Sequence, residues 1–559
     1  MKVPSFELSI RALIVLGCLT AVSSGQTELW SFYGDTTRDS FGVSIAGIGD
    51  MNGDGVPDIA VGAPHDDDGG LDAGSVTIFS GKSGNPIRLF KGPVGSNFGA
   101  AVSAAGDIDG DGWADLLVGA PFAKINGVQL VGAAYVLSPS DGRTIYSWNG
   151  AAYLDAFGSS ISSAGDADGD GVLDVAVGAS SFFQNLRGYV RVFSGRDGSL
   201  IREHRGTTAG DFLGTGLASP GDLDGDGHDE LLVGAPQTNV GRGYVKVFSG
   251  RTGLPLMTLT GLAVGDQFGH SVTGLGDLDG DQVRELAVGA YKSDLGGLDS
   301  GSVTVFSGAS FATLRTLKGD APHHWLGYAV ADAGDVDADG ISDLIAAAHG
   351  DNSQTVWTTY GRVYSGLDGR AVSTITVDLF STDSIIQAVD GLGDLDGDGR
   401  DDYLVSDFWS DEKGPDFGAV WVISGCNAPA ARYGPGCPGT GGEVPGLEFV
   451  GCPAPGAQTR LSIRNGLGGA PADLLVSLHG RANLGKANCR LHVMPPLFVI
   501  PVLLSGPSGV AGAGSFDLPI QIPPTVNLIG WRFNAQARVL DPGAYLGSTF
   551  TNGVEIVIQ

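Results

Sequence analysis

The chain has few basic residues and, beyond its N-terminus, no long apolar run. Its 559 residues include 32 Lys and Arg against 62 Asp and Glu, which makes the formal net charge −30. Nucleic acids and anionic membranes bind basic patches, so this balance argues against both as partners. No later segment reaches the roughly 18 apolar residues of a spanning helix, so we expect no transmembrane segment. The acidity suits an exported protein or a binder of cations.

Familiar catalytic signatures are also missing. The sequence contains no GxSxG, HExxH or CxxC motif and no basic phosphate cradle. We therefore expect no enzymatic activity. Two alternatives to a binding protein stay open, namely a polysaccharide- or lipid-acting hydrolase that uses the central funnel of the fold, and a purely structural surface protein.

Cysteine is absent from most of the chain. Cys18 lies near the N-terminus, and the other four cysteines lie in the last quarter, at Cys426, Cys437, Cys452 and Cys489. An oxidising location favours two disulfides over free thiols. Four cysteines allow three connectivities. All three remain open, with Cys437–Cys489 as the favoured pair.

The N-terminus has the pattern of an export signal. Lys2 and Arg11 precede an apolar core over residues 12–22, and small residues follow at 23–25. The apolar core is too short to span a membrane. We predict that residues 1–25 are a signal peptide and that the protein is secreted or displayed at the cell surface.

Glycine is abundant, with 92 residues, and it punctuates an internal repeat. Each repeat contains an acidic loop, and the first acidic residues of successive loops are 55 to 59 residues apart, at Asp50, Asp107, Asp166, Asp222, Asp277, Asp335 and Asp394.

Each repeat also contains short runs of Val, Ile and aromatic residues bounded by Gly, Pro, Asn and Asp, which is typical of strands. Four antiparallel strands repeated seven times predict a seven-bladed β-propeller over residues 26–425, because radial repetition protects sheet edges. The seventh repeat ends after its third strand, at residues 418–425. We expect residues 28–34 to supply its fourth strand and close the ring.

The acidic loops resemble calcium loops but not those of an EF-hand. An EF-hand loop ends in a bidentate Glu at position 12 and lies between helices. With Asp50 as position 1, position 12 is Val61, and every other repeat has Val or Ala there. The last acidic residue is instead at position 9, directly before a strand. Carboxylates at positions 1, 3, 5 and 9 suit a hard cation, and six or seven oxygens favour Ca²⁺ over Mg²⁺.

We therefore predict up to seven Ca²⁺ sites, one per repeat. Seven ions would bring the formal charge from −30 to about −16. Their predicted ligands are Asp50, Asn52, Asp54 and Asp58; Asp107, Asp109, Asp111 and Asp115; Asp166, Asp168, Asp170 and Asp174; Asp222, Asp224, Asp226 and Glu230; Asp277, Asp279, Asp281 and Glu285; Asp335, Asp337, Asp339 and Asp343; and Asp394, Asp396, Asp398 and Asp402.

Two loops depart from the pattern. Asn52 removes one charge from the first loop. Gln282 replaces the Gly of position 6 in the fifth loop, where a left-handed backbone costs a side chain about 1 kcal/mol. We predict that the fifth site is the weakest.

The order Phe-Gly, acidic nonapeptide and Gly-Ala-Pro resembles the FG-GAP repeats of the integrin α propeller. Phe-Gly occurs at Phe41, Phe98, Phe157 and Phe268, and Gly-Ala-Pro occurs in the first, second and fourth repeats. The resemblance covers roughly residues 28–425 and implies the propeller fold and the bound metal. It does not carry over integrin function, since no other integrin domain is visible.

Function is expected on the face opposite the acidic loops. The loops between second and third strands vary most between repeats, and variable loops on a rigid scaffold are common binding sites. Aromatic residues of these loops, above all Trp357, Tyr360 and Trp409, are the candidate ligand-binding residues, and the alternative is that they pack against their own loops. The expected partner is an extracellular glycan or protein, and the protein is expected to be a monomer.

The repeats stop at Cys426. Residues 426–445 form a Pro- and Gly-rich linker, and residues 446–559 contain alternating apolar runs with many prolines. Prolines exclude long helices, so a small β-sandwich is predicted. This segment resembles the C-terminal module of many exported bacterial proteins.

Overall fold

The structure is a computed structural model. It describes residues 28–180, 187–237, 241–350, 359–376, 385–411 and 416–425 and, in the last quarter, 431–433, 446–450, 458–465, 470–477, 481–484, 491–493, 498–505, 512–521, 532–541, 548–550 and 553–557. The described residues are all-β and contain no helix. None of them belongs to a helix with the length and apolarity needed to cross a bilayer. The predicted signal peptide and all five cysteines lie outside these ranges.

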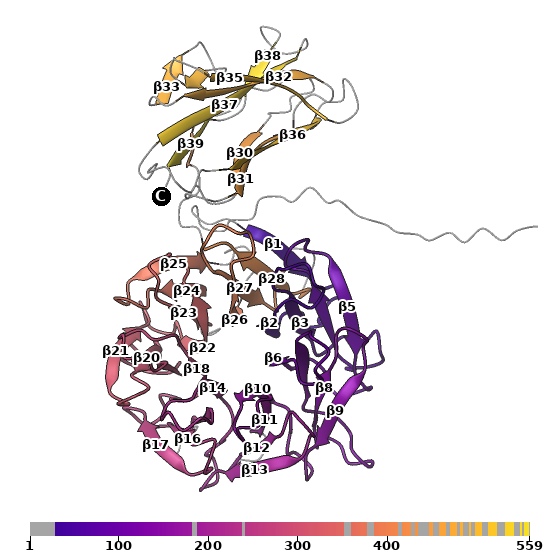
Figure 1. Ribbon diagram of the computed structural model, residues 1–559, viewed down its shortest axis with the longest axis vertical. Coiled ribbons are helices and arrows are strands. Elements are labelled where there is room, and N and C mark those ends of the chain that lie inside the picture. The colour runs from indigo at the N-terminus through magenta and orange to yellow at the C-terminus, as the bar shows by residue number, and fades with distance from the viewer. Residues whose placement is uncertain are drawn as a thin grey trace, which may run out of the picture.

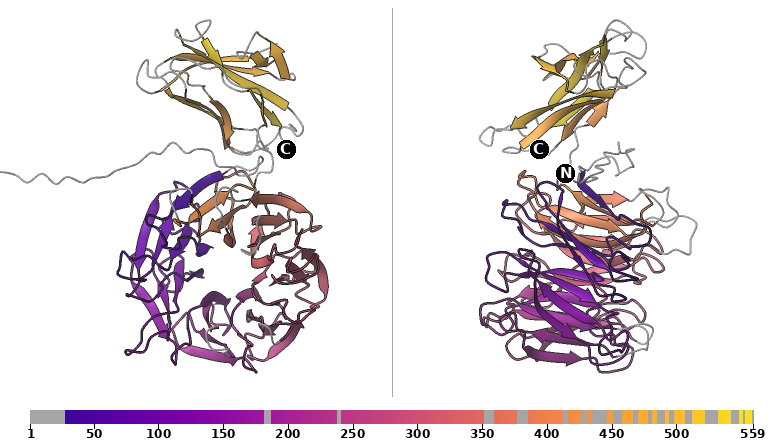
Figure 2. Two further views of the ribbon diagram at one scale, coloured as in Figure 1. Left: turned by 180° about the vertical axis from the view of Figure 1, so that it is seen from behind. Right: turned by 90° about the vertical axis from the view of Figure 1, so that its right-hand side faces the viewer.

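Seven four-stranded antiparallel sheets are arranged radially around a common axis (Figure 1). Figure 2 shows the same ring from behind and from its edge. The seven-bladed propeller predicted from the sequence is therefore confirmed. The blades, numbered one to seven in the order of the repeats, contain the strands β2 (Ser44–Gly47), β3 (Ile59–Ala63), β4 (Ser75–Phe79) and β5 (Pro86–Lys91); β6 (Ala101–Gly106), β7 (Asp115–Ala120), β8 (Ala133–Leu137) and β9 (Thr144–Asn149); β10 (Ser160–Gly165), β11 (Asp174–Ala179), β12 (Tyr189–Phe193) and β13 (Leu200–Arg205); β14 (Leu217–Gly221), β15 (Glu230–Ala235), β16 (Tyr244–Phe248) and β17 (Pro255–Thr260); β18 (Val272–Gly274), β19 (Leu286–Ala290), β20 (Ser302–Phe306) and β21 (Thr313–Lys318); β22 (Leu326–Gly334), β23 (Asp343–Ala348), β24 (Tyr360–Tyr364) and β25 (Ala371–Thr376); and β26 (Ile386–Gly393), β27 (Asp402–Asp407), β28 (Ala419–Ile423) and β1 (Glu28–Tyr33).

The ring closes as predicted, by pairing the two ends of the propeller. β1 lies antiparallel to β28 as the outer strand of the seventh blade, with Trp30 opposite Val422 and Tyr33 opposite Ala419. Phe32 of β1 is buried in the cluster between the seventh and first blades. The seventh blade is therefore built from segments almost 400 residues apart in the chain.

The hydrophobic core lies between neighbouring blades. The second strand of most blades is an uninterrupted apolar run, and β7, β11, β15, β23 and β27 are buried along their whole length. A blade's second strand has a neighbouring blade on each face, so it needs no polar face. The cluster between the first and second blades, for example, joins Ile48 and Val76 to Leu116 and Val118.

The Phe-Gly pairs pack in the interface between neighbouring blades. Phe157 is fully buried, and Gly158 has a φ of +88° while its N–H donates to the carbonyl of Gly178 at 2.9 Å. A Cβ at Gly158 would lie 2.3 Å from the carbonyl oxygen of Ala133, so only glycine fits.

The last quarter forms sheets of its own, outside the ring in every view (Figures 1 and 2). One sheet has the order β29-β39-β37-β32-β35 with β38 beside β37, another has the order β30-β31-β36, and β33 pairs with β34. A buried cluster joins Leu447 and Ile463 of the second sheet to Leu474 and Ala537 of the first. β29 lies inside the segment predicted as a linker. The β-sandwich stays a prediction. The strands are β29 (Ala431–Tyr433), β30 (Gly446–Val450), β31 (Gln458–Asn465), β32 (Pro471–Ser477), β33 (Arg481–Leu484), β34 (Leu491–Val493), β35 (Phe498–Leu503), β36 (Gly512–Gln521), β37 (Arg532–Leu540), β38 (Ser548–Phe550) and β39 (Gly553–Val557).

Candidate metal centres

The seven acidic loops join the first strand of each blade to the second. In the first loop, Oδ1 of Asp50 at position 1 accepts the N–H of Gly53 at 2.7 Å and Oδ2 accepts the N–H of Gly55 at 2.8 Å. The second loop repeats these bonds from Gly110 at 2.7 Å and Gly112 at 2.9 Å to Asp107. Against the opposing effect of burial, such bonds lower the pKa of Asp50. The position-1 carboxylate thus holds the loop in a tight turn.

The position-9 side chain is buried beneath its loop and, in the first repeat, bonds the loop to the segment after the third strand. Oδ2 of Asp58 accepts the N–H of Met51 at 2.8 Å, and Oδ1 accepts the N–H of Gly81, after the third strand, at 3.2 Å. The acidic residues at position 9 have no exposed surface at all in any of the seven loops: Asp58, Asp115, Asp174, Glu230, Glu285, Asp343 and Asp402.

Seven acidic side chains buried in this way are costly to ionise. Burial raises the pKa of Asp58 to about 6 and the pKa of each position-9 residue in the next five loops to about 7, and it raises the pKa of Asp402 well above its ordinary value. The neighbouring carboxylates of each loop add to this effect. A cation among these carboxylates would offset the cost.

In five of the loops, three or all four of the predicted ligands come together in space. Groups whose ligand oxygens all lie within 4.8 Å of one another include Asp107, Asp109 and Asp115; Asp166, Asp168 and Asp174; Asp222, Asp224, Asp226 and Glu230; Asp277, Asp279, Asp281 and Glu285; and Asp335, Asp337 and Asp339. All are oxygen donors, which suits a hard cation.

Several of these oxygens are buried without a hydrogen-bond partner. They include Oδ1 of Asp115, Oε1 of Glu230 and Oε1 of Glu285. The cause is visible at Asp115, because Pro139 stands where Gly81 stands in the first repeat and has no N–H to donate. Buried polar atoms are rarely left unpaired, and these oxygens could serve as ligands of a cation.

The loops need left-handed backbone at two positions. Position 6 has a positive φ, as expected, and Gln282 in the fifth loop adopts a φ of +70°. Position 4 also has a positive φ and is glycine in six loops, but it is Ala338 in the sixth, with a φ of +58°. The sequence reasoning missed position 4, although its glycine is repeated in six of the seven loops.

Basic residues reach four of the acidic loops. They come from the loop between the third and fourth strands, which lies on the same face. Nη2 of Arg143 lies 2.5 Å from Oδ2 of Asp109, and Nε of Arg196 lies 2.6 Å from Oδ2 of Asp170. Arg370 bonds the carboxylate of Asp337 in the sixth loop in the same way, whereas Nζ of Lys82 donates to the backbone carbonyl of Asp54 in the first loop at 2.9 Å. These cations were also missed by the sequence reasoning, because they lie about 30 residues from their partners.

Neighbouring acidic loops contact one another around the ring. Oδ2 of Asp229, at position 8 of the fourth loop, accepts the N–H of Asp166 in the third loop at 2.9 Å. Asp401 of the seventh loop bonds Asp335 of the sixth at 2.7 Å in the same way. Two pairs of loops are therefore linked at position 1, where a carboxylate ligand is predicted.

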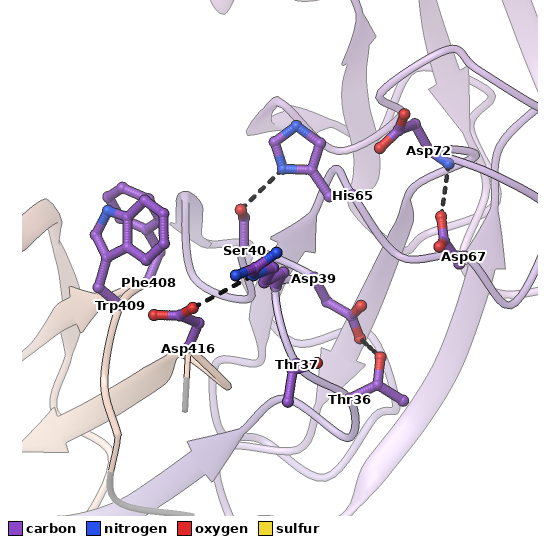
Figure 3. Close-up of a pocket in the computed structure, with 11 residues that line it drawn as sticks. Thr36, Thr37, Asp39, Ser40, His65, Asp67, Asp72, Phe408, Trp409 and Asp416 are labelled. Atoms are coloured by element: carbon purple, nitrogen blue, oxygen red, sulfur yellow. Dashed lines mark hydrogen bonds and ion pairs between the residues drawn. The ribbon is translucent and has the colours of Figure 1, made fainter. Parts of the chain in front are cut away.

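The predicted ligand-binding aromatics occupy different surroundings. Trp357 lies outside the described residues. Tyr360 is only 3% exposed, under the guanidinium of Arg362, so it offers no surface to a ligand. Trp409 lines a pocket between the first and seventh blades (Figure 3). Of the two that the structure describes, Trp409 lines this pocket and Tyr360 does not.

Comparisons with known proteins agree with the repeat pattern. The family model of the FG-GAP repeat matches residues 41–79, 98–137, 157–193 and 214–248. Similar proteins include integrin alpha-5 of Xenopus laevis, 35% identical over 211 residues, and integrin alpha-V of Gallus gallus, 33% identical over 213 residues. Each alignment covers 35% of this chain and 20% of the relative, so the chain spans about a fifth of the length of the curated relatives it matches.

Among solved structures, the Dos1 propeller aligns with 71% of this chain and 95% of its own, at 12% identity and a TM-score of 0.40. The four FG-GAP matches, which lie in the first four blades, and the integrin alpha relatives support an FG-GAP, integrin-alpha-like β-propeller.

Proposed function

We propose that this chain is an exported binding module, stabilised by up to seven Ca²⁺ ions, whose partner is an extracellular glycan or protein. The partner would dock on the face opposite the acidic loops. The likeness of the repeats to integrin alpha chains supports a binding or adhesion role.

The observation that carries the metal proposal is the set of fully buried position-9 carboxyl groups. Each faces the other carboxylates of its loop, and three have an oxygen without a hydrogen-bond partner. Burying a charge without a counter-charge is strongly unfavourable. A bound cation would supply that counter-charge, with positions 1, 3, 5 and 9 as its ligands.

Calcium is the favoured ion on two grounds. The ligands are all oxygens, and each loop offers several carboxylates in a compact turn. Ca²⁺ accepts six to eight oxygens in flexible geometry, whereas Mg²⁺ holds its waters and demands a near-ideal octahedron.

Thermal unfolding of the full chain tests this proposal. Protein stripped with EDTA and then titrated with Ca²⁺ should melt more than about 10 °C higher at saturation, because ions that bind only the folded state stabilise it by mass action. Mg²⁺ at the same concentration and ionic strength is the control and should restore much less. Equal melting temperatures in EDTA and in Ca²⁺ would contradict the metal proposal.

A second experiment addresses the partner. Labelled full-length protein is applied to arrays of extracellular glycans and matrix proteins, once in Ca²⁺ and once in EDTA. A binding role predicts a reproducible partner that is retained in Ca²⁺ and lost in EDTA. Turnover of a polysaccharide or lipid substrate, without stable binding, would overturn the proposal in favour of a hydrolase.

A further inference from the structure

A pocket of about 520 Å³ lies where the first and last blades meet, on the face opposite the acidic loops. Three segments line it (Figure 3). The connection from β1 to β2 contributes residues 36–40, the loop after β3 contributes His65, Asp67 and Asp72, and the loop after β27 contributes Phe408, Trp409 and Asp416. Its size suits a ligand of one or two amino-acid residues.

The repeat provides an internal comparison for the buried acid of this pocket. Asp39 and Asp211 occupy the same position of the repeat, two residues before the Phe-Gly pair or its Leu-Gly equivalent. Asp211 is fully buried, and its carboxylate accepts bonds from Thr207, Thr208, Gln237 and Tyr244, all at 3.0 Å or less. Burial acts to raise the pKa of Asp211, but these hydrogen bonds hold it below its ordinary value.

Asp39 is as deeply placed but lacks these donors. It is 4% exposed, and among the described residues its side chain accepts one hydrogen bond, from Oγ1 of Thr36 at 2.6 Å. The first repeat has Ser75 where Tyr244 stands in the fourth. It has His65 in place of Gln237, and His65 bonds Ser40 at 2.9 Å instead.

The electrostatics of Asp39 follow from these missing donors. Burial, opposed by Thr36 and reinforced by the carboxylates of Asp66 and Asp35, raises the pKa of Asp39 to about 6. The same repeat position is thus satisfied by protein donors in the fourth blade and left facing a cavity in the first.

The charges and the aromatic wall of the pocket indicate what would fill it. Four carboxylates line the cavity, at Asp39, Asp67, Asp72 and Asp416. Against them stands one guanidinium, that of Arg38, which is 82% exposed and 3.6 Å from Asp416. Carboxylates accept hydrogen bonds and cannot donate, so the ligand must be rich in donors. The ring of Trp409 favours an organic cation over a bare metal ion, since cations bind aromatic faces.

We propose that this pocket is a binding site for a basic side chain, the guanidinium or ammonium of an arginine or lysine in a partner protein. The inference deepens the proposed function and rests on it, because it assigns the partner's chemistry on the face already proposed for docking. The cation would bond Asp39 at the base of the pocket and Asp67 at its rim, with its aliphatic stem against Trp409.

The test uses small probes that separate charge from shape. Nα-acetyl-arginine methylamide, Nα-acetyl-lysine methylamide and the neutral arginine isostere Nα-acetyl-citrulline methylamide are titrated into the full-length, Ca²⁺-loaded protein and followed by ligand-observed NMR. The arginine and lysine probes should bind at least about 10-fold more tightly than the citrulline probe. Equal binding of arginine and citrulline probes would overturn the proposal.

Matched variants locate the site. Asp67 and Asp294 occupy the same turn in the first and fifth blades, and Oδ1 of each accepts a backbone N–H five residues later, at 2.7 and 2.8 Å. Asp67→Asn should weaken the arginine probe about 3-fold or more, whereas Asp294→Asn should leave its affinity unchanged. Trp409→Ala should weaken it as well. Equal effects of Asp67→Asn and Asp294→Asn would show that only the overall charge matters, which refutes a defined site.

The deepest residue gives the strongest test. Asp39→Asn keeps the shape of the side chain and should weaken the arginine probe about 10-fold. A melting temperature in Ca²⁺ close to that of the unmodified protein shows that the variant is folded, and if it does not fold, Asp67→Asn decides the question.

Two further outcomes would refute the cation site and show whether the proposed binding function still stands. Binding of methyl-β-glucoside or N-acetylglucosamine, lost in Trp409→Ala and without binding of the arginine probe, would overturn the cation site in favour of a glycan site. If the arrays find a partner whose binding is unaffected by Asp39→Asn and Asp67→Asn, the pocket proposal fails while the binding function stands.

Discussion

The two faces of the propeller are built from the same seven repeats and differ in how closely those repeats agree. On the acidic face, the bond from position 6 to the position-1 carboxylate is 2.8 Å in the first loop, 2.9 Å in the second and 2.8 Å in the third. On the opposite face, equivalent residues have different partners, as Asp39 and Asp211 illustrate. The comparison indicates that one face is constrained by a shared chemical task and the other is free to diverge.

The physical reason lies in the range of the contacts. An acidic loop is organised mainly by bonds within its own repeat, from the loop's own N–H groups and from the backbone after the third strand of the same blade, so each repeat can build its own site. A pocket on the opposite face needs two or three loops from neighbouring blades. At the junction of the first and seventh blades those loops come from opposite ends of the propeller segment.

The largest expected effect on stability comes from removing one buried position-9 carboxylate. Asp174→Asn should destabilise the protein by about 2 to 4 kcal/mol in millimolar Ca²⁺, because a ligand is lost from a filled site. In EDTA the difference should shrink towards zero or reverse, since the isosteric amide removes an uncompensated buried charge. Denaturant unfolding of both proteins in both buffers measures this difference in the free energy of unfolding.

Asp197→Asn, an exposed change in the same blade, is the control and should have little effect in either buffer. An Asp174→Asn penalty of the same size with and without Ca²⁺ would mean that position 9 acts through its hydrogen bonds alone.

A carboxyl on a first strand, away from both loop faces, offers a pH-dependent test. Oδ2 of Asp390 in β26 accepts the N–H of Gly47 at 3.0 Å, and burial, reinforced by Asp332, raises the pKa of Asp390 to about 7. The folded state therefore holds this proton more tightly than the unfolded state does. Its contribution is full below about pH 4 and is lost as the pH rises through about 7.

Asp390→Asn should therefore gain stability relative to the unmodified protein as the pH rises from 5 to 8, on the order of 1 to 3 kcal/mol. Melting temperatures of both proteins across this range, in constant Ca²⁺, measure the difference. The exposed change Asp294→Asn should show no such trend. If the stability gained by Asp390→Asn over the unmodified protein stays constant or falls as the pH rises, the raised pKa of Asp390 is contradicted.

The smallest expected effects concern the two strained loops. Gln282→Gly and Ala338→Gly should each stabilise the protein by about 0.5 kcal/mol, because relief of left-handed strain is partly offset by the greater freedom of glycine in the unfolded chain. Gln282→Gly should also raise the calcium affinity of the fifth site, which isothermal titration calorimetry can follow.

Gly112→Ala is the matched opposite change. It lies at position 6 of the second loop with a φ of +93°, and its added Cβ would meet no atom within 4 Å. It should cost about 1 to 2 kcal/mol through backbone strain alone. If Gln282→Gly leaves the calcium affinity unchanged, the prediction that the fifth site is the weakest is wrong.

Sequence reasoning succeeded where the signal was local and repeated. The period of 55 to 59 residues predicted the number of blades, and the missing fourth strand of the seventh repeat predicted that β1 would pair with β28. It failed for single residues. Tyr360 was a candidate ligand-binding residue because it ends a variable loop, yet it begins β24 and is buried there.

The sequence by itself determined the architecture and the chemistry of the acidic loops, because strand patterns and nine-residue turns depend on residues close together in the chain. The tertiary structure alone decided which acids are buried and which lack partners. Asp39 and Asp211 have the same place in the repeat. The fourth repeat has Gln237 and Tyr244 where the first has His65 and Ser75, but only the tertiary structure shows that those two side chains bond Asp211 and that Asp39 lines a cavity.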